Sequence, residues 1–151
     1  MVVLGIVSVM TVAAASALAY SDEVVGVTQE EIWTAANDIL APLGLRKSDP
    51  EKGYLESKWV EDVTERKDPL FKRIENRHSR RTRYSVRISA TDIGTKIEVY
   101  GKFQYRREIG GSGRGPWRVM KKKSDDFQAE RELFDRILQQ MAKNRTDVKP
   151  V

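Results

Sequence analysis

Polar and apolar residues alternate over the second half of the chain, in two stretches that are joined by a short turn. In the first stretch, one side of the alternation consists of Thr82, Tyr84, Val86, Ile88 and Ala90. In the second stretch, it consists of Thr95, Ile97, Val99, Gly101, Phe103 and Tyr105. The positions between them are mostly charged or polar, and Thr91–Gly94 has the composition of a compact turn. The pattern predicts a long antiparallel hairpin with one apolar and one polar face.

Two other segments repeat apolar residues at intervals of three and four, which is the period of an amphipathic helix. The first set is Ile32, Ala35, Ala36, Ile39, Leu40 and Leu43, and the second is Phe127, Leu133, Phe134, Ile137, Leu138 and Met141. Thr28 and Glu31 have the spacing of a capping box, so we expect the first helix to begin at Thr28. Gly44 is suited to end this helix, and Pro42 favours an end two residues earlier.

Weaker signals surround these elements. Glu23–Val27 is rich in β-branched residues and predicts a first strand, and Pro116–Met120 predicts a short last one anchored by Trp117. Arg46–Gly53 has the residues of a turn. Residues 61–81 are the most polar part of the chain, and their pattern leaves open an irregular connection or a twisted extension of a strand.

Apolar and polar residues alternate in Tyr54–Asp62, and this pattern predicts which side of the strand Trp59 occupies. A period of two places Leu55, Ser57 and Trp59 on one side of a strand. We therefore expect Trp59 to face the core and to seal the sheet against the first helix.

The element order predicts an α+β fold, in which an antiparallel β-sheet carries two amphipathic helices packed on one face. A length of 151 residues suits one domain. We expect residues 22–143 to form this single α+β domain and residues 144–151 to be a disordered tail.

The N-terminal segment indicates export. Val2–Tyr20 contains no charged residue and includes Ala17-Leu18-Ala19, a pattern that signal peptidase accepts. We expect residues 1–19 to be a signal peptide cleaved after Ala19. No basic residue precedes the apolar run and its length approaches that of a membrane span, so an uncleaved anchor or a buried helix remain open. The expected location is the periplasm, or a membrane anchor facing the periplasm, with membrane association through residues 2–20.

The composition argues against enzymatic chemistry. The chain has no cysteine, which excludes disulfides, thiolate nucleophiles, thiolate metal sites and a lipidated cysteine. The single histidine, His78, stands among arginines, where a solvated side chain is the common case. No metalloprotease, nucleophile-elbow or P-loop pattern occurs, and Gly110–Gly115 is best interpreted as a flexible hairpin loop. We expect no catalytic residue, no metal site and no cofactor.

Charge suggests what kind of partner the protein meets. The formal net charge is +5 and the isoelectric point is about 9.5, which favours anionic partners. The candidate contact surface comprises Arg80, Arg81, Arg83, Arg87, Arg106, Arg107 and Arg114. An envelope protein or anionic lipid headgroups suit an exported protein. Binding of single-stranded nucleic acid through phosphate contacts and stacking is a third reading, but export argues against it.

Glu30–Asp62 resembles the repeated domain of the BamC (NlpB/DapX) family of outer-membrane assembly lipoproteins. The residues that carry the resemblance are Trp33, Ile39, Leu40, Gly44, Asp49, Gly53 and Trp59. The stretches TRYSVRI, GTKIEVY and ELFDRILQQM follow in the same order, so the resemblance covers about Val24–Met141. It implies a helix-grip fold and a non-enzymatic accessory role in outer-membrane protein assembly. This chain lacks the lipidated cysteine of that family.

We therefore expect an exported, non-catalytic interaction domain of a bacterial cell envelope. The alternative is a carrier of a small apolar ligand or lipid, because a helix-grip fold can open a cavity between helix and sheet. Trp33, Trp59, Phe103 and Phe134 are the candidates to line such a cavity.

Overall fold

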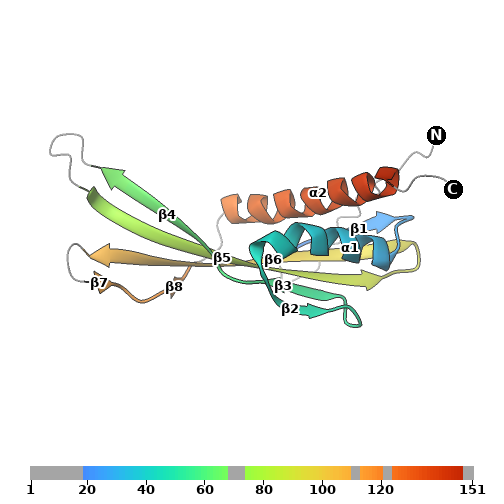
Figure 1. Ribbon diagram of the computed structural model, residues 1–151, viewed down its shortest axis with the longest axis horizontal. Helices are drawn as coiled ribbons and strands as arrows, with labels where there is room; N and C mark the ends of the chain where they lie inside the picture. The colour runs from blue at the N-terminus through green and yellow to red at the C-terminus, as the bar shows by residue number, and fades with distance from the viewer. Residues whose placement is uncertain (1–18, 68–73, 110–112, 121–123, 148–151) are drawn as a thin grey trace.

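The computed structural model describes residues 19–67, 74–109, 113–120 and 124–147 (Figure 1). The described residues form two α-helices and eight strands. They are β1 (Tyr20–Val25), α1 (Gln29–Leu40), β2 (Leu45–Asp49), β3 (Tyr54–Ser57), β4 (Val60–Lys67), β5 (Ile74–Ala90), β6 (Gly94–Ile109), β7 (Gly113–Arg114), β8 (Arg118–Val119) and α2 (Ser124–Asp147).

The strands form one antiparallel sheet with the central order β1-β6-β5-β3-β2. The long hairpin of β5 and β6 is its spine, with registers that run from Arg77 opposite Glu108 to Ala90 opposite Thr95. Along the free edges of this hairpin, β4 pairs with the outer half of β5, while β7 and β8 pair with β6. The alternating pattern had predicted this hairpin, and the structure confirms it.

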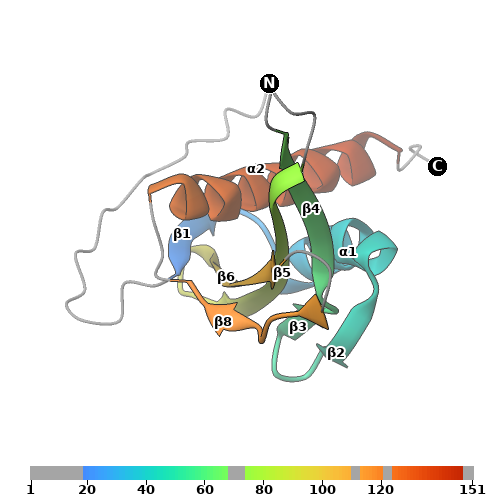
Figure 2. The same ribbon diagram turned by 90° about the vertical axis from the view of Figure 1, so that its left-hand side faces the viewer.

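Both helices lie side by side on one face of the sheet (Figures 1 and 2). The core lies between the helices and the sheet. On the sheet side it is formed by those side chains of β5 and β6 that the alternating pattern predicted to be on the apolar face. Its fully buried members include Ile32, Leu40, Leu55, Ile88, Ile97 and Ile137. Burying these side chains supplies the main driving force for folding. The predicted α+β class, with an antiparallel sheet and two helices on one face, is thus observed.

Local signals determine how α1 begins and ends. The Thr28 hydroxyl accepts a hydrogen bond from the Glu31 amide, while the Glu31 carboxylate accepts one from the Thr28 amide, which completes the capping box. The α-helix ends at Leu40, a 3-10 turn covers Ala41–Leu43, and Gly44 follows with a φ of 83°. The proline inside that turn accounts for the early end of the α-helix.

Besides the two-residue β7, which lies in the expected hairpin loop Gly110–Gly115, two strands were not expected. Residues 45–49 form β2, although their polar residues suggested a turn. Residues 60–67 form β4, in a region whose sequence was compatible with either an irregular connection or a strand extension. In both cases pairing of the backbone with a neighbouring strand defines the element. A strand stabilised by its ladder need not show an alternating pattern, because either face can be polar when it is solvated.

The chain ends were predicted less well. The first strand begins at Tyr20 rather than Glu23. The expected disordered tail is wrong for residues 144–147, since α2 continues to Asp147. There Arg145 donates hydrogen bonds to the Glu31 carboxylate at 2.7 and 3.0 Å, which tie the last turn to α1. The predictions for residues 1–18 and 148–151 lie outside the described residues. None of the described helices is long and apolar enough to cross a membrane.

Candidate functional site: the open face of the sheet

The face opposite the helices, called the open face here, carries most of the polar side chains of the sheet. Because Val86 and Ile88 point into the core, the odd-numbered residues of β5 point the other way. Cross-strand partners share a face, which extends the open face to β3 and β6. Its principal members are Tyr54, Glu56, Arg81, Arg83, Arg87, Lys102, Gln104 and Arg106.

Three arginines and two tryptophans alternate across the open face and form the arginine–tryptophan ladder. Trp59 lies between Arg83 and Arg81, whose guanidinium carbons are 4.2 and 4.3 Å from its ring centroid. Trp117 lies between Arg81 and Arg106, at 4.2 and 4.4 Å. These are cation–π distances, so each indole is sandwiched by positive charge.

Hydrogen bonds and charges hold the ladder to the sheet. Arg81, the central rung, donates through Nε and Nη2 to the side-chain oxygen of Gln104, at 2.8 and 2.6 Å. At one end, Arg106 lies 3.9 Å from the carboxylate of Glu61. Burial, together with the nearby charges of Arg83 and Arg106, lowers the pKa of Arg81, while Glu61 opposes this change. The ladder therefore keeps three cations close together in a fixed arrangement.

The expected position of Trp59 in the core is wrong. Ser57 is fully buried and its hydroxyl accepts a hydrogen bond from the Tyr84 amide. The predicted row of core-facing residues, Leu55 and Ser57, is therefore present up to the end of β3. The chain then leaves the strand at Lys58, whose amide donates to the Gly44 carbonyl at 2.8 Å. This break ends the period of two, and Trp59 comes to lie on the open face instead.

The four proposed cavity residues do not surround one space. Phe103 and Phe134 are buried on the helix side, Phe134 with its ring 5.1 Å from that of Tyr20. Trp33 packs against the edge of the core. Since Trp59 lies on the opposite face, a cavity lined by all four residues is excluded.

The seven arginines of the predicted contact surface are also divided between the two faces. Arg81, Arg83, Arg87 and Arg106 lie on the open face, and Arg114 shares it by register because it pairs with Glu108. Arg80 points to the helix side, where it binds Asp126 at 2.7 Å and covers the ring of Phe103. Arg107 shares that side by register, and Arg114 is exposed on β7.

The ladder ends at a buried carboxylate, that of Glu56. Its oxygens accept hydrogen bonds from Arg46 and from the Tyr54 hydroxyl, the latter at 2.6 Å, and Arg83 lies 3.6 Å away. Burial alone would raise the pKa of Glu56, but the hydrogen bonds from Tyr54 and Arg46 lower it below its ordinary value. Glu56 is thus an anion that joins β2, β3 and β5.

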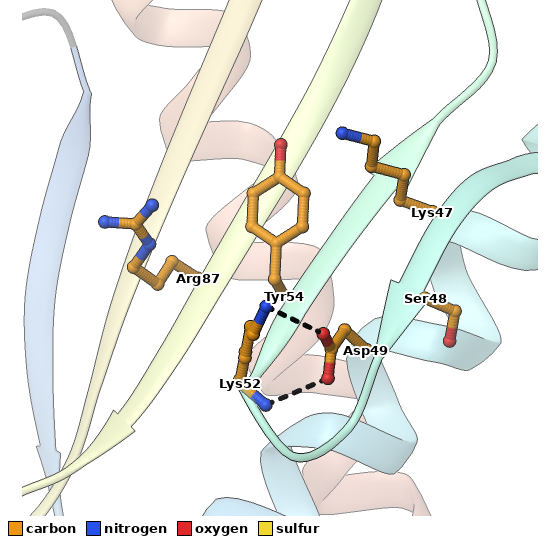
Figure 3. A pocket seen from close by; sticks show the side chains of 6 residues that line it. All are labelled: Lys47, Ser48, Asp49, Lys52, Tyr54 and Arg87. Carbon is orange, nitrogen blue, oxygen red and sulfur yellow. Dashed lines mark hydrogen bonds and ion pairs between the residues drawn. The ribbon is translucent and has the colours of Figure 1, made fainter.

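Beside Glu56, the open face has a hollow of about 700 Å³, which we call the Tyr54 hollow (Figure 3). It is lined by Lys47, Ser48, Asp49, Lys52, Tyr54 and Arg87. Lys52 is held by Asp49, through its amide at 3.1 Å and its ammonium group at 3.8 Å. Sequence reasoning missed the β2 and Lys52 side of this hollow, because it assigned those residues to a turn.

The described residues contain no group of three or more histidine, cysteine, aspartate or glutamate side chains that could hold a metal ion. The side chain of His78 lies outside the described part of the structure. Comparison with known proteins finds no matching protein-family model and no similar curated protein.

Proposed function

We propose that this protein is an exported, non-catalytic interaction domain of a bacterial cell envelope, which binds an anionic partner through the open face of its sheet. The resemblance of Glu30–Asp62 to the outer-membrane assembly lipoproteins supports an accessory role in that process. The uncharged segment that ends in Ala17-Leu18-Ala19 supports export.

The observation that carries this proposal is the difference between the two faces of the sheet, one covered by helices and the other open. Both helices cover one face, whereas the other carries several cations, of which some are paired with carboxylates of described residues and others are not. Lys47, Arg87 and Lys102 are exposed there and take part in no ion pair with a described residue. Such a surface attracts anionic groups and fixes the orientation of a bound partner.

The ladder favours a lipid or protein partner over single-stranded nucleic acid. Non-specific binding of single strands relies on aromatic rings that stack with bases. In Trp59 and Trp117, guanidinium groups already occupy the ring faces. The two indoles therefore order the arginines of the open face, and their ring faces are not available to stack on a base.

A charge-reversal experiment tests the proposal. One variant carries Arg87→Glu and Lys102→Glu on the open face, and its matched control carries Arg136→Glu and Lys143→Glu, two exposed positions on α2. Immobilised proteins are incubated with envelope extract, and the captured proteins and lipids are identified by mass spectrometry. The open-face variant should lose the specific partner while the control retains it. Equal capture by both would refute binding through the open face, and fractionation of the native protein into the cytoplasm would refute export.

A further inference from the structure

We propose that the Tyr54 hollow is a binding site for a phosphate monoester, held between Lys47 and Arg87 over the ring of Tyr54. This inference rests on the proposed function, because it names the chemistry of an anionic partner on the same face. The group it fits best is a phosphorylated lipid headgroup.

The charges around the hollow favour an anion. Asp49 is engaged by Lys52, and Glu56, just beyond the hollow, accepts from two donors and lies close to a third. Lys47 and Arg87 are exposed and have no ion pair with a described residue. Glu98, the cross-strand neighbour of Arg87, is paired with Lys96 at 3.0 Å. Two positive charges therefore remain over the hollow, while Asp49, Glu56 and Glu98 each have a cationic partner.

The arrangement suits a phosphate better than a carboxylate. Figure 3 shows Lys47 and Arg87 on opposite sides of the Tyr54 ring, so one group placed over the ring is approached by a cation from each side. A phosphate monoester carries a charge of about −1.5 to −2 near neutral pH and has three strong acceptor oxygens. Arginine can bind two of these oxygens with its planar fork, and lysine acts as a point charge on the third. A single carboxylate would neutralise only one of the two cations.

Tyr54 provides an uncharged surface between the two cations. Its hydroxyl donates to Glu56, and burial together with this hydrogen bond raises the pKa of the phenol. The ring is therefore neutral at physiological pH and does not repel a phosphate. Its face can contact the carbon atoms that carry the phosphate, and a hollow of about 700 Å³ has room for them.

The test uses glycerol 3-phosphate as a soluble probe, measured by equilibrium dialysis against glycerol as the neutral control. Lys47→Met and Arg87→Met each remove an unpaired cation, and we expect each to weaken binding about tenfold. Lys143→Met is the control, because it removes the same charge from an exposed position on α2, on the opposite side of the sheet from the hollow. It should leave the affinity within about twofold of the native value.

Flotation with vesicles identifies the source of the phosphate. Vesicles of phosphatidylcholine with phosphatidic acid present a monoester, and vesicles with phosphatidylglycerol present only a diester. Preference for phosphatidic acid, lost in Lys47→Met, supports a lipid headgroup, whereas binding of glycerol 3-phosphate without binding of vesicles would replace the lipid by a soluble metabolite. Absence of saturable binding to either probe, or equal loss in all three methionine variants, overturns the site. If partner capture by the open face persists in that case, the proposed function stands without it.

Discussion

Replacing Trp59 by leucine should destabilise the protein through the ladder rather than through the core. The indole contacts Arg81 and Arg83, at 4.3 and 4.2 Å from its centroid, and belongs to a face that the helices do not cover. Leucine retains an apolar side chain but has no ring to attract a guanidinium group. The two arginines would then repel each other without the aromatic ring between them.

The size of the effect follows from the exposure of the contacts. A cation–π contact contributes about 0.5–1 kcal/mol when exposed and about 2 kcal/mol when desolvated. The Arg83 side chain is 20% exposed, which places its contact between these limits. Losing both contacts should cost about 1–3 kcal/mol of the free energy of unfolding.

Urea unfolding followed by far-ultraviolet circular dichroism measures this loss, and a double-mutant cycle separates the ladder from simple loss of apolar area. Combining Trp59→Leu with Arg83→Met should show a coupling energy of about 0.5–1 kcal/mol. Combining it with Arg80→Met should show none, because Arg80 lies on the helix side and binds Asp126. A coupling to Arg83 no larger than that to Arg80 would refute the ladder as a source of stability.

Four further substitutions test other parts of the fold by the same unfolding assay. Gly53→Ala should cost at least about 3 kcal/mol, because its φ is 62° and a Cβ would lie 2.0 Å from a backbone carbonyl, whereas Gly26→Ala, with a φ of 72° and open space around it, should cost only about 1–2 kcal/mol; equal costs would contradict the steric argument. The hydrogen bonds from Arg145 and from the capping amide lower the pKa of Glu31 to about 2 from an ordinary value of 4.5. The contribution of ionised Glu31 to the free energy of unfolding is therefore complete above pH 4.5 and is lost as the pH falls towards 2. Arg145→Met should remove most of this acid dependence, about 1 kcal/mol after solvent screening, and an unchanged pH profile would contradict the prediction. Glu56→Gln should cost about 2–3 kcal/mol, because it leaves two arginines near an uncharged group, and a neutral outcome would show that solvent already compensates them.

The sequence predicted those parts of the fold that depend on local periodicity. The hairpin of β5 and β6, the apolar faces of the helices and the capping box at Thr28 each require only residues close together in the chain. β2 and β4 lacked such a pattern, since backbone pairing with a neighbouring strand defines them. Their polar residues suggested a turn or left the structure open.

The candidate site was harder to predict, because its contacts join distant parts of the chain. Nothing in the sequence near Trp59 indicates that Arg81 and Trp117 will stack in one array with it. One error was avoidable. Arg80 has the same parity as Thr82 and Tyr84, which the alternation had placed on the helix side, so grouping it with Arg81 as one surface ignored the pleat of the strand.

The ladder and the Tyr54 hollow are connected through one carboxylate, and this makes the open face behave as a unit. Glu56 accepts a hydrogen bond from Tyr54, whose ring lies in the hollow, and its other oxygen lies 3.6 Å from Arg83, the last rung of the ladder. A change that loosens the ladder therefore also removes a support of Glu56 and, through it, of the Tyr54 ring. Because these side chains are ordered before any partner arrives, binding to the hollow need not restrict them further. A surface that merely remained solvated would not require this chain of contacts.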